Sequence, residues 1–343
     1  MNTVKIADIA KAAGVSPSTV TRVIRNDKYV SEEKRKLVQQ ALEKFSYVPN
    51  RVASGLRSKQ TNLIGHILPV SSENPFFARI GNAFNKAAED AGYNVLTAVT
   101  QMNPLKERAM VENFVSLMVD AIVITTMTAI DDDTINMVCS RGIPVVMIER
   151  PCSLPIVDAI LFDNHQASSL AIHNFIKNGH KDIGFIGREP QKREVENQRL
   201  NGYIDVMRQN NLPIRKEWTI LTDDYTANDG RMAMERILSA ATLPSALLVT
   251  SDVLACGILQ VLHEHNLRVP EDISLIGFDN TLSALSTPPL TTIDLQPEQI
   301  GITALEMISE QKNGKRKGSK SVILSPILIE RTSVKNFERS YLS

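Results

Sequence analysis

The sequence has 343 residues, of which 43% are hydrophobic and 22% are charged, so it is long enough for two or three globular domains with sizeable cores. Its 38 basic and 38 acidic residues cancel, but the first 60 residues hold 12 Lys and Arg against 5 Asp and Glu. A basic head on an acidic remainder is typical of a nucleic-acid-binding module joined to another domain, with a chance fluctuation of surface charge as the alternative.

Cysteine usage and hydropathy exclude further classes of protein. Cys139, Cys152 and Cys256 are widely separated and lack the spacing of metal or redox motifs, so we expect reduced thiols. No secretion signal precedes Thr3, and no apolar run approaches the roughly 18 residues of a membrane span. We therefore expect a soluble, cytoplasmic protein with no membrane partner.

Residues 6–25 have the pattern of two short helices joined by a glycine turn. The apolar residues of the first helix recur on one face; they are Ile6, Ile9, Ala10 and Ala13. Gly14 supplies the positive φ at which helices commonly end, and Ser16 followed by Pro17 is a typical helix start. The second helix is apolar at Val20, Val23 and Ile24, and its other face carries Ser18, Thr21, Arg22 and Arg25. This pattern favours a DNA-binding helix-turn-helix over an ordinary helical hairpin, because an arginine there can form a bidentate bond to guanine.

A third helix is predicted to begin at Ser31 and to complete a three-helix domain near Pro49. Its inward-facing residues are expected to be Leu37, Val38, Ala41, Leu42 and Phe45. Residues 50–58 have helical spacing but are too few for a stable isolated helix. They are either a flexible linker or a segment that becomes helical only when it packs against something else.

From Leu63 onward, short β-branched runs alternate with helical stretches. The runs are LIGHILP, NVLTAV, AIVITT, PVVMIE, AILFDN, DIGFIG, SALLVTSD and ISLIGFD, and the helical stretches include residues 78–91, 106–118 and 166–178. This alternation predicts parallel sheets covered by helices, and its length favours two doubly wound lobes over a single sheet. Ligands of such folds bind at the carboxyl ends of strands and between lobes.

Polar residues follow several of the predicted strands. Glu149, Asn164, Asp252 and Asp279 stand at such positions, and Asn164 or Asp252 could instead begin a helix. The aromatic pair at residues 76–77 could line a crevice or belong to the core. Carboxylates, an arginine and an aromatic floor suit a ligand rich in hydroxyl groups, such as a sugar, or a nucleobase.

Motifs of the common catalytic classes are missing from the sequence. It contains no Walker A loop, no GxGxxG opening a helix, no GxSxG and no HExxH, and its six histidines lack metal-like pairing. We therefore expect no catalytic residue, no cofactor and no metal. The rival functions are a transport-type binding protein, which would leave the basic head without a role, and a sugar- or nucleotide-dependent enzyme that uses the crevice carboxylates.

The sequence resembles the lactose-repressor/galactose-repressor family of transcription regulators from end to end. The segments that carry the resemblance are IADIAKAAGVSPSTVTRVI, YVSEEKRKLVQQALEKFSYVPNRVASGLRS, NPFF, DNHQASSLAIHNFIKNGHKDIGFIG, RLNGY, SDVLACGILQVLHEHNLRVPEDISLIGFDN and LTTIDLQPEQIG. The resemblance implies an all-α helix-turn-helix headpiece, a hinge helix and a two-lobed, doubly wound α/β core of the periplasmic-binding-protein type.

The resemblance also implies an interleaved domain order. We expect a headpiece at 1–49, a hinge at 50–60, an N-terminal lobe at 61–161 and 294–323, a C-terminal lobe at 162–293 and 324–336, and a tail at 337–343. The tail lacks the heptads that form a tetramer, so a homodimer is expected.

By the same resemblance, Pro17, Ser18 and Arg22 occupy base-reading positions, and the phosphate-contacting positions hold Ser16, Thr19, Thr21 and Asn26. Thr21 stands where serine is more usual, which keeps the hydroxyl. The hinge positions hold Asn50, Val52, Ala53 and Leu56, of which Leu56 would be the wedge inserted into a minor-groove step.

The effector-contacting positions of the family hold Phe76, Phe77, Glu149, Arg199, Tyr225, Asp252 and Asp279. The function implied is a sequence-specific repressor of a carbohydrate-utilisation operon. It would bind a pseudo-palindromic operator as a homodimer under the control of an effector held between the lobes. That effector would be a sugar or sugar acid, or a nucleobase.

Overall fold

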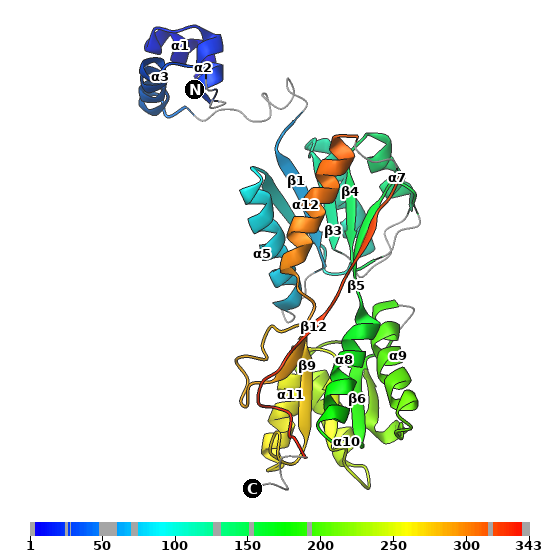
Figure 1. The fold of residues 1–343 in the computed structure, drawn as a ribbon. Coiled ribbons are helices and arrows are strands. Elements are labelled where there is room, and N and C mark those ends of the chain that lie inside the picture. Colours follow the sequence, from blue (N-terminus) through cyan, green and yellow to red (C-terminus); the bar gives the residue numbers. More distant parts are fainter. Residues whose placement is uncertain are drawn as a thin grey trace. The chain divides into compact units, whose positions relative to one another are not determined.

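A computed structural model of the chain describes residues 4–24, 27, 29–47, 60–69, 75–125, 132–150, 154–190, 194–314 and 318–337. The chain divides into two compact units, Met1–Thr61 and Asn62–Ser343 (Figure 1). Of the first unit's predicted site residues, Asn26, Asn50, Val52, Ala53 and Leu56 lie outside the described residues.

The described residues of the first unit form three helices, α1 (Ile6–Ala13), α2 (Pro17–Ile24) and α3 (Glu32–Lys44). As predicted, Gly14 ends α1 with a φ of 64°. The buried residues of its small core are Ile9, Ala10, Ala13, Val20, Val23, Val38 and Ala41.

The sequence prediction for α3 is wrong at two positions. Leu37 and Phe45 are 43% and 37% exposed, although both were expected to face inward. Leu37 is turned about 100° away from the buried stripe formed by Val38 and Ala41, and Phe45 is the C-cap, beyond the last helical turn.

The second unit contains two six-stranded sheets. The first has the order β11-β5-β4-β3-β1-β2, and the second has the order β12-β10-β9-β8-β6-β7. Every pair of neighbouring strands is parallel except β10 and β12. The strands of the first sheet are β1 (Leu63–Leu68), β2 (Asn94–Val99), β3 (Ala121–Thr125), β4 (Val145–Ile148), β5 (Asp158–Phe162) and β11 (Ser321–Leu324). Those of the second sheet are β6 (Ile183–Arg188), β7 (Thr219–Thr222), β8 (Ala246–Val249), β9 (Ser274–Phe278), β10 (Thr291–Asp294) and β12 (Ile327–Ile329).

Helices pack against both sheets and against one another. Some of the helices that contact each other are consecutive in the chain, and others are far apart in it. The helices are α5 (Pro75–Asp90), α6 (Pro104–Ser116), α7 (Asp132–Ser140), α8 (Asn164–Lys177), α9 (Glu194–Gln209), α10 (Ala227–Leu238), α11 (Asp252–Glu264) and α12 (Glu298–Lys312). The pairs include α5 with α12, α8 with α9 and α10 with α11 (Figure 1). Among the described residues, no helix combines the length and the hydrophobicity that a bilayer-spanning segment needs.

Three connections run from one sheet to the other. The chain leaves the first sheet after β5 and enters α8, which packs against strands of the second sheet. It returns after β10 into α12, which packs against α5, β4 and β5, and it leaves again between β11 and β12. Each sheet with its helices is called a lobe below; the first lobe holds the β1 sheet and the second lobe holds the β6 sheet.

The packing of α10 against α11 depends on two glycines. A Cβ atom at Gly257 would lie 1.8 Å from the carbonyl oxygen of Ala227, and one at Gly230 would lie 2.1 Å from that of Leu254. Because the obstructing atoms belong to the backbone, a larger residue at either position forces the helices apart.

We therefore expect Gly257→Ala to lower the free energy of unfolding by about 1–3 kcal/mol through overpacking, measured by urea unfolding with circular dichroism. Gly81→Ala on α5 is the matched control, since its Cβ would meet only the flexible end of Leu68 at 3.0 Å, while the helix gains up to about 1 kcal/mol in propensity. Equal destabilisation by the two variants would contradict this account of the packing.

Candidate functional site

The outer face of α2 presents the residues that were predicted to read DNA. Pro17, Ser18 and Arg22 are exposed, whereas Val20 and Val23 on the opposite face are buried. A helix that packs by one face and exposes hydroxyls and a guanidinium on the other can enter a major groove.

Hydrogen bonds at the start of α2 hold its first turn. Ser16 Oγ accepts a hydrogen bond from the Thr19 amide at 3.2 Å and lies 2.8 Å from Ser18 Oγ. Thr21 Oγ1 donates to the carbonyl of Pro17 at 2.9 Å, so this hydroxyl can still accept. Ser16 therefore caps the helix, as its sequence position predicted.

Arg22 keeps most of its side chain in solvent. Its side chain is 63% exposed, and its Nε lies 3.9 Å from Asp27 Oδ2. A pair this long and this exposed contributes little to stability, so it leaves the guanidinium able to exchange the carboxylate for a base edge.

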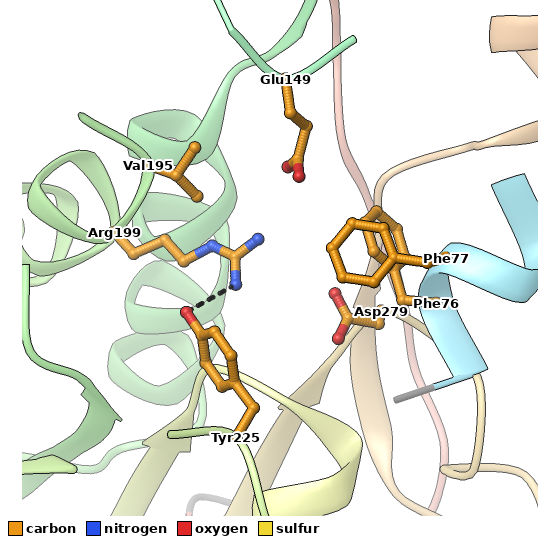
Figure 2. Close-up of a pocket in the computed structure, with 7 residues that line it drawn as sticks. All are labelled: Phe76, Phe77, Glu149, Val195, Arg199, Tyr225 and Asp279. Carbon is orange, nitrogen blue, oxygen red and sulfur yellow. Dashed lines mark hydrogen bonds between the residues drawn. The ribbon is translucent and has the colours of Figure 1, made fainter. Parts of the chain in front are cut away.

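A pocket lies between the two lobes. The first lobe supplies Phe76 and Phe77 from the start of α5 and Glu149 from the end of β4; the second supplies Val195 and Arg199 from α9, Tyr225 from before α10, and Asp279 from the end of β9. Figure 2 shows Arg199 reaching into the space between Glu149, Tyr225 and the aromatic pair. Six of the seven predicted effector residues thus surround one cavity.

Fixed partners hold the buried Arg199 guanidinium in place. Nε donates to Asn164 Oδ1 at 2.8 Å, and Nη1 donates to the Thr250 carbonyl at 3.0 Å and to the Tyr225 hydroxyl at 3.5 Å. The guanidinium also lies 4.1 Å from the ring centre of Phe278. Within the described chain, Nη2 has no hydrogen-bond partner, so it remains a donor for a ligand.

Two carboxyl groups face this cation, and burial changes their protonation. Burial raises the pKa of the Glu149 carboxyl to about 7, although Arg199 acts in the opposite direction. Burial likewise raises the pKa of the Asp279 carboxyl to about 8 against the effect of Arg199. Glu149 Oε1 is buried without a hydrogen-bond partner among the described residues. The described lining of the pocket therefore offers one permanent cation and two carboxyls that can donate or accept near neutral pH.

The backbone at both carboxyls is unusual. Glu149 has a φ of 64° and Asp279 a φ of 88°, each directly after a buried strand. Non-glycine residues with positive φ are uncommon and are concentrated at functional sites, where the surrounding structure holds them in place.

Asp252 was predicted as an effector residue, and the structure does not place it on the pocket. Its Oδ2 accepts hydrogen bonds from the amides of Thr281, Leu282 and Ser283 at 2.7–3.1 Å. Its Oδ1 accepts from the Phe278 amide and from Thr292 Oγ1, both at 3.0 Å. The carboxylate is thus fully engaged in holding the loop after β9, and a ligand has no lone pair to use there.

Sequence reasoning missed two contributors to the pocket. Val195 lines it, and Asn164 orients Arg199. Val195 carries no chemical signal that distinguishes it from a core residue. Asn164 stood at a strand end but was interpreted as a helix start or a ligand contact. Its actual partner lies 35 positions away.

Comparison with known proteins agrees with this geometry. Residues 5–50 match the family described as bacterial regulatory proteins, lacI family, and residues 172–334 match the periplasmic binding protein-like domain. The HTH-type transcriptional repressor PurR of Pasteurella multocida (strain Pm70) is 34% identical over 332 residues, which cover 96% of this chain and 98% of that protein. The chain belongs to the lacI family of bacterial regulatory proteins. The resemblance and the fold class predicted from sequence are both confirmed.

Solved structures of lacI-family regulators superimpose on most of the chain. The lac repressor dimer bound to operator and the anti-inducer ONPF has a TM-score of 0.82 and 26% identity, covering 97% of this chain and 100% of that chain. A complex of the transcriptional regulator CelR with cellobiose has a TM-score of 0.71 and 25% identity, covering 96% and 99%. This lacI-family member is a DNA-binding transcriptional repressor and not an enzyme.

The raised pKa of Glu149 predicts a pH-dependent cost in the unliganded protein. A carboxyl whose pKa is higher in the folded state stabilises the fold below its unfolded value and loses this contribution as pH rises through the folded value, here from about 4.5 to about 7. We expect Glu149→Gln to melt a few degrees above the parent at pH 8 and to converge with it near pH 4.5 in thermal unfolding. Glu112→Gln, at an exposed position on α6, is the control. The prediction is contradicted if the melting temperatures of Glu149→Gln and the parent differ by the same amount at every pH in this range.

Proposed function

We propose that this repressor binds a pseudo-palindromic operator as a homodimer and is switched by a small polyhydroxylated effector, a sugar or sugar acid, held in the pocket between its lobes. The observation that carries the proposal is the buried Arg199 guanidinium, fixed by the second lobe. It faces the Glu149 carboxyl of the first lobe, whose buried Oε1 has no hydrogen-bond partner among the described residues. The residues proposed to contact the effector are Phe76, Phe77, Glu149, Val195, Arg199, Tyr225 and Asp279.

The chemistry of the pocket supports such a ligand. Buried polar groups without partners are costly, so a ligand gains affinity by satisfying them. Several hydroxyls can donate to Glu149 and Asp279 while their oxygens accept from Arg199, and an apolar ring face can pack against Phe76 and Phe77. The neighbours support this class, since the CelR structure is a complex with cellobiose and a lac repressor structure holds ONPG.

A nucleobase is the second candidate. The rings of Phe76 and Phe77 lie 5.5 Å apart at an angle of 64°, which offers both an edge and a face to a planar ring. Carboxyls with pKa values of about 7 and 8 can serve as donor or acceptor near neutral pH, and the edge of a nucleobase presents both kinds of group.

Operator binding follows from the headpiece. One recognition helix reads about half a site, so two-fold dimers on a pseudo-palindrome are expected, and the lac repressor neighbour is itself a dimer on its operator. We assign base contacts to Pro17, Ser18 and Arg22, and hinge contacts to Asn50, Val52, Ala53 and Leu56. The protein would act in the cytoplasm, where its operator lies and where it would regulate carbohydrate use.

Binding selection from a library of randomised palindromic duplexes tests the DNA half of the proposal. We expect one preferred sequence, for which Arg22→Ala loses about 10- to 100-fold in affinity because a bidentate contact to guanine is removed. Lys36→Ala, which removes one exposed positive charge from α3, is the control and should weaken specific and random duplexes equally. If selection yields no preferred sequence, the operator proposal fails.

A thermal-shift panel of neutral sugars, sugar acids and nucleobases tests the effector half, with calorimetry on each hit. We expect Arg199→Ala to lower the affinity for the hit at least about tenfold, the usual worth of a charged hydrogen bond, while operator binding without effector persists. Arg208→Ala, exposed on the same helix, is the matched control. Equal affinity in parent and Arg199→Ala would remove Arg199 from the effector site, and a nucleobase hit would select the second candidate.

A further inference from the structure

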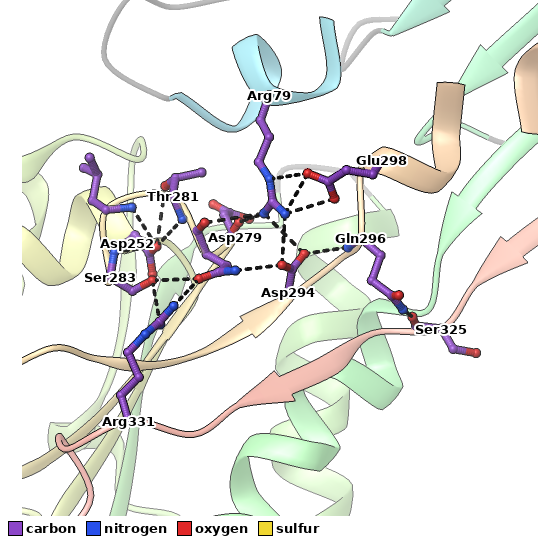
Figure 3. A network of polar contacts seen from close by, with 12 residues as sticks. Arg79, Asp252, Asp279, Thr281, Ser283, Asp294, Gln296, Glu298, Ser325 and Arg331 are labelled. Atoms are coloured by element: carbon purple, nitrogen blue, oxygen red, sulfur yellow. Dashed lines mark hydrogen bonds and ion pairs between the residues drawn. The ribbon is translucent and has the colours of Figure 1, made fainter. Parts of the chain in front are cut away.

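Arg79 stands one helical turn behind the aromatic wall of the pocket. It belongs to α5, three residues after Phe76, and its side chain is 24% exposed. It does not line the pocket. Its guanidinium points instead to the place where both lobes and one of their connections meet (Figure 3).

The guanidinium bonds to both lobes at once. Toward the second lobe, Nη1 donates to the carbonyl oxygens of Asp279 at 3.0 Å and Asn280 at 3.4 Å, and the Asp294 carboxylate accepts from Nη1 at 3.3 Å and from Nη2 at 3.0 Å. Toward its own lobe, Nε and Nη2 donate to the carboxylate of Glu298 at 2.9 and 3.0 Å. Only a planar fork with five donors can make these contacts together.

The two carbonyls that Arg79 binds belong to the strained end of β9. Asp279 has a φ of 88° and Asn280 a φ of 50°, and the Asp279 side chain is a wall of the pocket. A backbone in this region keeps its shape only where its surroundings fix it. Arg79 is therefore one of the contacts that aim the Asp279 carboxyl at the cavity.

The network extends into the connections between the lobes. Asp294, at the end of β10, also accepts from Asn280 Nδ2 and from the amide of Gln296, both at 2.7 Å. The Gln296 side chain donates to the carbonyl of Ser325 at 2.7 Å, and Ser325 lies between β11 and β12. Two of the three connections are thus bonded to each other beside Arg79.

Burial separates this network from ordinary surface ion pairs. Exposed pairs contribute little, and the Glu298 carboxylate, whose side chain is 59% exposed, belongs to that class. The Asp294 side chain is only 8% exposed, so its bond to Arg79 forms where water competes weakly. The strong part of the contact is the part that crosses from α5 to the second lobe.

We propose that Arg79 is a positioning residue that sets the spacing between the start of α5 and the end of β9, and thereby the distance between the pocket walls that carry Phe76, Phe77 and Asp279. Its effect on the effector response rests on the proposed function; its effect on the geometry of the unliganded protein does not.

Amide hydrogen exchange on the unliganded full-length protein tests the geometric claim. The reporters are the amides of Asp279, bonded to the Ile293 carbonyl at 2.8 Å, and of Gln296, bonded to Asp294 Oδ1 at 2.7 Å. We expect Arg79→Ala to speed exchange there by about tenfold, while amides in the centre of β9 keep the parent's rate. Arg231→Ala, which removes an exposed bidentate pair with Glu264 elsewhere in the second lobe, is the matched control and should leave the reporters unchanged.

Arg79→Lys distinguishes the effect of the planar guanidinium, with its several donors, from the effect of the positive charge alone. Lysine keeps the positive charge but cannot bond to the carbonyls and to both carboxylates together, so we expect it to remain closer to Arg79→Ala than to the parent. Parent rates in Arg79→Ala, full rescue by lysine, or uniform acceleration across the second lobe would each overturn the proposal. These outcomes require neither operator nor effector, so they are independent of the tests of the proposed function.

Discussion

The pocket between the lobes is organised around the buried guanidinium of Arg199. Removing an arginine from water is costly unless fixed partners replace its hydration, and for Arg199 those partners are Asn164, the Thr250 carbonyl, the Tyr225 hydroxyl and the face of Phe278. All of them belong to the second lobe. The cation is therefore fixed relative to that lobe and faces the first lobe across the cavity, so a ligand that bonds to both sides joins the lobes.

The protonation of the carboxyls around this cation bears on the class of ligand that we propose for the pocket. Burial opposes ionisation of Glu149 and Asp279, with pKa values of about 7 and 8, while each is drawn toward ionisation by Arg199. Because desolvation and the attraction of Arg199 oppose each other, each carboxyl can be protonated or ionised near neutral pH. It can therefore donate a hydrogen bond to one ligand group or accept one from another. Hydroxyls and ring edges that both donate and accept are complementary to such groups.

The three chain connections between the sheets link the pocket to the arrangement of the two lobes. The chain crosses between the sheets after β5, after β10 and between β11 and β12. Any change in the angle between the lobes must therefore be accommodated by all three crossings together. Arg79 and Asp294 lie at this junction, directly behind the pocket wall. The pocket and the junction of these connections are therefore joined by one polar network. In the function that we propose, an effector needs to favour one lobe arrangement by only about 1–3 kcal/mol to change operator affinity severalfold or more.

The sequence by itself determined the local elements and the class of the protein. Helical periodicity located α1 and α2 and their glycine turn. Each of the eight apolar runs overlaps a strand, because residues that face the core recur at the spacing of the element that they belong to. The sequence did not reveal β7, β10, β11 or β12. Of these, β7, β11 and β12 are short and only partly buried, and β10 is buried but has only four residues, three of them polar. Nor could the sequence separate Asp252 from Asp279, since each follows a buried strand. Only the tertiary structure decided that one carboxylate caps a loop and the other faces the cavity, because that choice depends on amides and a guanidinium brought there by distant parts of the chain.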